Sequence, residues 1–277
     1  IWNFKNTLDY NLNFETDPDL SEQALKNQVR EQIRVEVKDI MEVTNAGYFY
    51  PRISKNMVNF NYITDESLHD FRSFQNILRA FDEIANFVEL DENNMNTYSH
   101  KIRELLILSC TEVEYLMKKL LLDNNYQNNG YLNTRNYYEC KNILKLDQYK
   151  VKLKKYKNIR SFKPFNDWTD VDQQTTQSIP WYEAYNKVKH DRGGNFSKAN
   201  LKHLLDSIAA IHILLEAQYG KNIFHQLYSM SEDKSLFITT TYPEWDLIDI
   251  CVPKLKIGPK REVLTEWLGT KHYFNQS

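Results

Sequence analysis

A group of polar, protonatable side chains lies between residues 181 and 194 of this chain. Asn186 and His190 are four residues apart, which places them on one face of a helix, and Lys189 and Arg192 flank the histidine. An imidazole can take a proton from a hydroxyl, and a nearby cation or amide can stabilise the charge that develops on a phosphate. These residue types suit metal-free cleavage of a phosphodiester in RNA. They equally suit a structural network that caps a helix junction, and the sequence leaves both interpretations open.

The helix that follows this group is the most regular in the sequence. Its apolar face is formed by Leu201, Leu204, Leu205, Ile208, Ile211, His212 and Leu215, which recur at intervals of three and four. Ser197 can cap its start and Gly220 can end it. Residues 191–194 indicate a break before it. The polar group is therefore predicted at a junction between two helices.

This arrangement resembles the HEPN superfamily of helical bundles, in which a polar motif ending in histidine closes one helix just before a long final helix. The family motif is an arginine, four to six residues and a histidine, and it forms a metal-independent ribonuclease site at a dimer interface. Glu183, Ala184 and Tyr185 occupy the arginine positions here. The resemblance, which covers roughly residues 98–220, then implies that Lys189 or Arg192 supplies the cation.

The same resemblance implies a homodimeric RNA endonuclease of the toxin or phage-defence kind, with no cofactor and no metal. The alternative from another class is a non-catalytic module of this fold that binds RNA or a partner protein through the same patch. The absence of the usual arginine favours the second, and the group of Asn186, Lys189, His190 and Arg192 favours the first.

Residues 98–122 predict a central helix that is apolar almost all round. Glu112 and Glu114 interrupt its apolar rows. We expect at least one of these carboxylates to be partly buried and to need a cation or a hydrogen-bond donor as its partner. It either locks this helix to a neighbour or orients His190 and pairs with a cation beside it. Arg103, near the start of the helix, is expected on an exposed turn.

Residues 123–178 form an insertion between the two bundle helices, and it carries a run of cations. Tyr149, Val151 and Leu153 alternate with lysines, which is the period of a half-buried strand with a basic outer face. We call the cations the basic strip: Lys150, Lys152, Lys154, Lys155, Lys157 and Arg160. Flat side chains lie among or after them at Tyr156, Phe162, Phe165 and Trp168. Cations interleaved with aromatic rings can bind single-stranded nucleic acid, whereas the alternative is a solvated strand whose lysines only keep the insertion soluble.

Composition limits the remaining classes. The 35 basic and 37 acidic residues give a formal net charge of -2, so any nucleic-acid site must be a local patch. The three cysteines show no CxxC spacing, which indicates free thiols in a reducing cytoplasm rather than a metal site. No stretch has the length of a membrane span or the layout of a signal peptide, so we expect a cytoplasmic protein without membrane contact.

The predicted fold is mainly α: a HEPN-like helical bundle with N-terminal helices packed on it and short strands in the insertion and the C-terminal part. We expect an N-terminal helical region over residues 1–97, the bundle over 98–220, and a C-terminal extension over 221–277 with a helix and a β-hairpin around Tyr242 and Pro243. The outer helices are predicted over 19–42, 67–90, 224–230 and 262–268. His212 is expected to be a core histidine.

Overall fold

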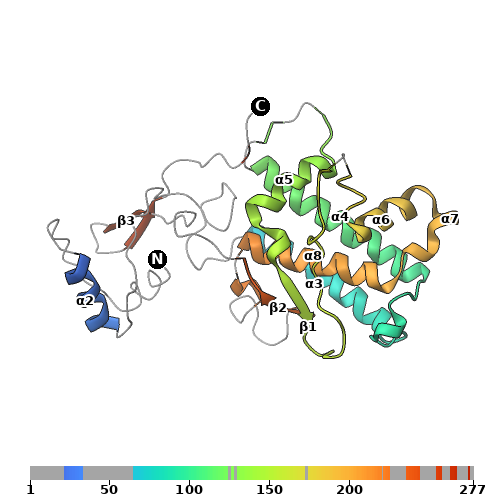
Figure 1. The fold of residues 1–277 in the computed structure, drawn as a ribbon, viewed down its shortest axis with the longest axis horizontal. Coiled ribbons are helices and arrows are strands. Elements are labelled where there is room, and N and C mark those ends of the chain that lie inside the picture. The colour runs from blue at the N-terminus through green and yellow to red at the C-terminus, as the bar shows by residue number, and fades with distance from the viewer. Residues whose placement is uncertain are drawn as a thin grey trace. The chain divides into compact units, whose positions relative to one another are not determined.

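The computed structural model describes residues 22–33, 65–123, 126–127, 130–171, 174–219, 221–224, 235–243, 254–257, 263–266 and 274 of the 277-residue chain. The chain divides into two compact units, one formed by residues 1–48 and 245–269 and the other by residues 49–244 and 270–277. The described part is mainly helical (Figure 1), which confirms the predicted class. None of its helices is long and apolar enough to cross a membrane.

In the first unit the structure describes one helix and two strands. Helix α2 (Glu22–Ile33) confirms the described part of the helix predicted over residues 19–42, and residues 19–21 and 34–42 lie outside the described part. Strand β3 (Lys254–Ile257) pairs antiparallel with β4 (Val263–Glu266). The short helix predicted over residues 262–268 is therefore wrong, and the β-branched valine and threonine of β4 favour the strand that forms instead.

The second unit is a bundle of helices around α8 (Leu201–Tyr219), whose side chains are buried on nearly every side. Helix α4 (His100–Asp123) packs on α8, and both α3 (Asp65–Ala85) and α6 (Pro180–His190) pack on α4 and α8. Helix α5 (Thr134–Leu144) packs on α4. The long helices predicted in this part of the chain are confirmed, since each has an apolar face wide enough to be covered by two neighbours.

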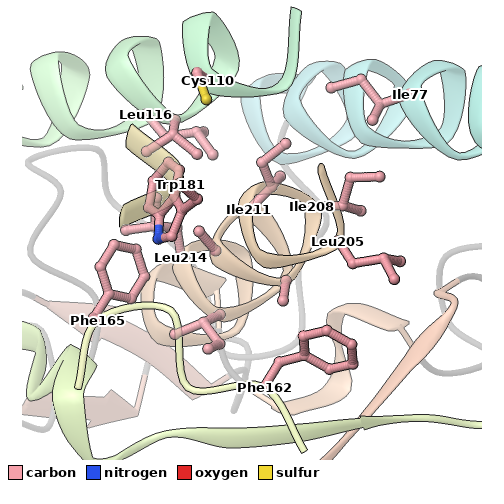
Figure 2. Close-up of a cluster of buried hydrophobic side chains, with 14 of the residues drawn as sticks. Ile77, Cys110, Leu116, Phe162, Phe165, Trp181, Leu205, Ile208, Ile211 and Leu214 are labelled. Carbon is pink, nitrogen blue, oxygen red and sulfur yellow. The ribbon is translucent and has the colours of Figure 1, made fainter. Parts of the chain in front are cut away.

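Side chains from these helices and from the insertion meet in one hydrophobic core (Figure 2). The close-up shows Ile208, Ile211 and Leu214 of α8 between the helices above and the insertion below. The residues that face them are Ile77, Cys110, Leu116, Phe162, Phe165 and Trp181. The insertion is thus part of the core of this unit.

Strand β1 (Lys150–Leu153) pairs antiparallel with β2 (Phe237–Thr241). Val151 and Leu153 point into the core and the lysines point outward, so the strand predicted from alternation is confirmed. The predicted C-terminal hairpin places a strand correctly at β2, but within the described residues its partner is β1 and not the segment that follows. Residues 244–253 lie outside the described part.

Short turns connect the long elements. They are η1 (Glu92–Asn94), η2 (Leu146–Gln148), α7 (Arg192–Asn195), η4 (Phe196–Lys198) and η5 (Lys221–Phe224). Because η4 occupies the residues before α8, the helix begins later than predicted, and Asn200 rather than Ser197 caps it, with its side chain accepting from His203 N at 3.1 Å. The helix predicted over 224–230 falls mostly outside the described residues.

The connection near residue 97 is tied to the start of α8. Leu201 N donates to Thr97 O and Lys202 N donates to Met95 O, both at 2.9 Å. These two bonds satisfy amide groups that a helix start leaves without an internal partner. The boundary expected from the sequence at residue 97 therefore falls within a hydrogen-bonded part of the second unit.

Candidate functional site

The polar residues of α6 that face α4 form a hydrogen-bonded chain around Glu114. Glu114 Oε1 accepts from Tyr182 Oη at 2.5 Å, and Oε2 lies 3.5 Å from Tyr185 Oη. Lys189 Nζ donates to Tyr185 Oη at 2.8 Å and lies 4.9 Å from the centre of that ring. The three α6 residues recur at intervals of three and four, so they share one face of the helix. We call these four residues the Glu114 cluster.

Burial and neighbouring groups raise the pKa values of Tyr182 and Lys189 in the Glu114 cluster. Burial, and then the hydrogen bond to Glu114, raise the pKa of Tyr182. The hydrogen bond to Tyr185 raises the pKa of Lys189. The neighbouring Cys110 thiol is fully buried, and its pKa is raised well above its usual value by burial and then by Glu114. A protonated phenol, an ammonium and a protonated thiol are weak nucleophiles at neutral pH. The hydrogen bonds of this cluster link α4 to α6.

Glu112 points to the other side of α4. Its carboxylate accepts from Ser73 Oγ of α3 at 2.8 Å, and burial raises its pKa while the Ser73 bond opposes the rise. Glu112 and Glu114 are both half-buried and both have hydrogen-bond donors, so the expectation of a partly buried carboxylate is confirmed. Within the described residues, neither forms a hydrogen bond or an ion pair with His190.

The end of α6 leaves His190 in solvent. His190 is the last residue of the helix and is exposed, and its imidazole has no hydrogen bond or ion pair to the described part of the chain. Asn186 lies one turn earlier on the same helix face and is half-buried. Lys189 is exposed but its ammonium is held by Tyr185. The structure therefore connects Lys189 to Glu114 through Tyr185 and leaves the imidazole free for a ligand.

Asp191 separates α6 from α7 and confirms the predicted break between helices. Its carboxylate accepts from Gly194 N and from Asn195 Nδ2, each at 3.2 Å, and so caps α7. A Cβ at position 194 would lie 2.8 Å from Asp191 Oδ2, which explains the glycine. The two glycines belong to a helical turn instead of a loop. Helix α7 begins at Arg192, whose side chain lies outside the described structure.

Arg103 of α4 lies at the end of α6, and the sequence did not place it there. Its Nη2 donates to the Val188 carbonyl at 3.3 Å, which satisfies one of the last acceptors of α6 and places a positive charge at the negative end of the helix dipole. The side chain is half-buried and its Nε is buried without a partner. The expectation that Arg103 lies on an exposed turn is wrong. Nothing in the local sequence signals this contact, because the two residues are far apart in the chain.

The basic strip lies on the outer face of β1 and on the segment that follows it. Lys152, Lys155 and Lys157 are exposed, and they form no ion pair within the described residues. Lys150 and Lys154 are half-buried. Lys150 and Lys152 face outward because β1 turns its apolar side chains toward the core, whereas Lys154, Lys155 and Lys157 follow the strand in sequence.

Arg160 has a different role from the lysines. Its Nη2 donates to Asp206 Oδ2 of α8 at 3.2 Å, and its backbone amide donates to Glu92 Oε1 at 2.6 Å. Burial raises the pKa of Asp206 to about 6, and Arg160 opposes that rise. The guanidinium also lies 5.3 Å from the centre of the Phe162 ring. Arg160 therefore fastens the end of the basic strip to α8.

The aromatic rings near the basic strip are core residues. Phe162, Phe165 and Trp168 are at most 2% exposed, and Trp168 Nε1 donates to the Thr175 carbonyl. Of the two interpretations that the sequence leaves open, stacking of these three rings on nucleotide bases does not fit the structure, because none of them has a free face. Burying rings of this size stabilises the fold by about 2 to 3 kcal/mol each, which accounts for their presence. Tyr156 alone of the four is half-buried.

His212 is buried beneath the β1–β2 pair, and the predicted core histidine is confirmed. Its Nδ1 lies 2.7 Å from Ser235 Oγ and its Nε2 lies 3.0 Å from Thr239 Oγ1. The ring stacks on Phe224, with centroids 4.3 Å apart. Burial lowers the pKa of His212 to about 3, and its Nε2 lies 3.7 Å from Glu216. All of these side chains are closed to solvent, so this network is structural.

In the described parts of the chain, no three His, Cys, Asp or Glu side chains are grouped so as to hold a metal ion. Comparison of the sequence and the fold with protein-family models, curated proteins and solved structures gave no significant match.

Proposed function

We propose that this protein is an RNA-binding module that holds the phosphate backbone of RNA with the lysines of the basic strip. The proposal is supported by the exposure of Lys152 on β1 and of Lys155 and Lys157 just after it, with no ion pair to any of the three in the described structure. Lysines without internal partners are available to replace the counterions that surround a nucleic acid. The overall charge is slightly negative, so this concentration of cations is local.

Because the nearby aromatic rings are buried, we expect the basic strip to contact the phosphates of RNA more than its bases. With Phe162, Phe165 and Trp168 in the core, only the half-buried Tyr156 remains beside the basic strip as a ring for a base. Contacts with phosphate carry little sequence information, whereas contacts with bases do. We therefore expect binding that depends strongly on salt and weakly on RNA sequence.

Anisotropy titrations of a labelled single-stranded RNA at several salt concentrations test this function. Replacing Lys152, Lys155 and Lys157 together by Ser removes three phosphate contacts, so the slope of log K against log salt should fall by about 2 for single-stranded RNA. The control replaces three other exposed cations, Arg72, Arg79 and Lys198, by Ser. An equal loss in both variants would show that only net charge matters and would overturn the assignment to the basic strip.

A second candidate is metal-independent RNA cleavage at the end of α6, favoured by the exposed His190 and by the guanidinium of Arg103 nearby. His190 would take the proton of a ribose 2′-hydroxyl, and the freed oxygen would attack the adjacent phosphorus to form a 2′,3′-cyclic phosphate. The bond to the 5′-oxygen breaks, and that oxygen leaves as a hydroxyl with a proton from water. Arg103 uses one of its five donors on Val188 within the described residues, so it supplies the cation that the motif lacks. Lys189 and Arg192 would add charge beside the phosphate, and the active form would be a homodimer of the toxin or phage-defence kind.

Cleavage assays on purified protein separate the two candidates. If the α6 end is catalytic, His190→Ala abolishes cleavage, since a positioned base contributes roughly 100- to 10,000-fold, while RNA affinity and thermal stability stay unchanged. Chelator should have no effect. Asn186→Ala, on the same helix face, is the matched variant and should lower cleavage by a smaller factor. If the wild-type protein binds RNA but does not cleave it, the nuclease proposal is refuted and the RNA-binding function is retained.

A further inference from the structure

Three aromatic side chains gather on the surface where α4 and α8 begin. Tyr98 lies two residues before α4, His100 is the first residue of α4, and Phe196 is the first residue of η4, the turn before α8. The Phe196 ring contacts both of the others. Its centroid is 5.5 Å from that of Tyr98, in an edge-to-face arrangement, and 4.7 Å from that of His100. We call these three residues the ring platform.

The ring platform stays on the surface, unlike the rings of the insertion. Tyr98 is 50% exposed, His100 is exposed, and Phe196 is half-buried. The contact with Phe196 therefore leaves half of the surface of Tyr98 in water. Removal of apolar surface from water is what stabilises a packing contact, so Tyr98 contributes only part of what a core ring contributes. Its open surface is available to a flat ligand.

Backbone hydrogen bonds hold the ring platform in place. Tyr98 pairs with Asn200 in an isolated antiparallel bridge, which ties the start of α4 to the start of α8. Ser99 Oγ accepts from Ile102 N at 3.2 Å and so caps α4. The rings therefore extend from a fixed junction of two helices. A ligand that stacks on them does not have to order this segment first, which lowers the entropic cost of binding.

We propose that the ring platform stacks on the bases of a single-stranded RNA whose phosphates lie on the basic strip. This inference rests on the proposed RNA-binding function and adds base contacts that the buried rings of the insertion cannot make. The two surfaces are joined through η1: Arg160 N, at the end of the basic strip, donates to Glu92 Oε1 of that turn, and Tyr98 follows the turn by four residues. Cations along the backbone and rings beneath the bases are the two parts of a single-strand site.

Stacking determines which nucleic acid the ring platform favours. Every base has a flat face, so stacking adds affinity with little dependence on sequence. This agrees with the weak sequence dependence expected of phosphate contacts. In a duplex the bases already stack on their neighbours, so their faces are closed to a ring of the protein. The ring platform should therefore select single strands, which the basic strip alone would not do.

Anisotropy titrations with two single-stranded RNAs of equal length, one with bases and one with abasic sugars, test the proposal. The wild type should bind the RNA with bases more tightly. Tyr98→Ala should lower that affinity roughly 5- to 100-fold, the usual effect of losing one stacked base, and should leave the affinity for the abasic RNA unchanged. Tyr98→Phe keeps the ring and should bind like the wild type. Tyr131→Ala, which removes a ring that is 99% exposed in the loop before α5, is the control.

Salt dependence separates the ring platform from the basic strip. Tyr98→Ala removes no phosphate contact, so its slope of log K against log salt should equal that of the wild type, whereas the variant without the three lysines should have a shallower slope. Equal wild-type affinity for the two RNAs, or full affinity in Tyr98→Ala, would overturn the ring platform and leave the basic strip intact. An equal loss of affinity for both RNAs in Tyr98→Ala would show a structural role and would overturn it as well. A wild type that binds neither RNA would overturn both proposals.

Discussion

The hydrogen bond between Tyr182 and Glu114 joins α6 to α4, and we expect its removal to lower the stability of the protein. Tyr182→Phe deletes one oxygen, which donates to Glu114 Oε1 at 2.5 Å. The carboxylate is half-buried, so it loses a donor that water replaces only in part. Hydrogen bonds to charged groups contribute about 1.5 to 3 kcal/mol, and we expect a loss of unfolding free energy in that range.

Tyr185→Phe is the matched control because it deletes the same atom one turn along α6. Tyr185 Oη lies farther from Glu114, at 3.5 Å, and its closer partner is the exposed Lys189, which water can solvate. The expected loss is below ~1 kcal/mol. Urea unfolding followed by circular dichroism at neutral pH measures both. Equal losses in the two variants, or no loss in Tyr182→Phe, would refute the argument that this bond fastens α6 to α4.

Two further predictions concern buried titratable groups. Glu112→Gln should leave the protein as stable as the wild type or more stable at pH 7. Burial disfavours the charged carboxylate and so raises the pKa of Glu112, whereas the neutral amide can still accept from Ser73 without the cost of burying a charge. A loss above ~1 kcal/mol in urea unfolding would contradict this prediction. His212 has its pKa lowered from 6.5 to about 3, so the unfolded chain takes up the proton first and stability is lost as pH falls through this window. Between pH 6.5 and 4.5 the loss should approach ~2 to 3 kcal/mol, and His212→Leu, although less stable overall, should show a flatter dependence in the same window.

Much of the fold follows from periodicity in the sequence. The three-and-four spacing of Leu201 to Leu215 and of the apolar residues in 67–90 fixed α8 and α3, because a helix with a wide apolar stripe has to cover it. The alternation around Val151 similarly predicted β1. The local sequence pattern does not specify which strand pairs with β1, however. The pairing of β1 with β2 joins segments far apart in sequence, so a strand near Phe237 was predictable and its neighbour was not.

The candidate site shows the same limit. Spacing indicated that Glu112 and Glu114 need partners, but the donors, Ser73 and Tyr182, lie on other helices. Arg103 of α4 donates a hydrogen bond to the Val188 carbonyl of α6, and the residues near Arg103 in the sequence do not predict this contact. The sequence left the role of the rings after the basic strip open for a physical reason: an aromatic side chain near lysines has the same sequence signature whether it packs inward or faces a ligand.

If the lysines of the basic strip hold RNA by its phosphates, as we propose, RNA affinity must depend on salt through these side chains. Titrations at several salt concentrations compare the wild type with the variant in which Lys152, Lys155 and Lys157 are replaced by Ser. We expect a steep negative slope for the wild type and a slope shallower by about 2 in the variant, with the same thermal melt. A wild-type affinity that does not change with salt, or slopes that agree between the two proteins, would contradict it.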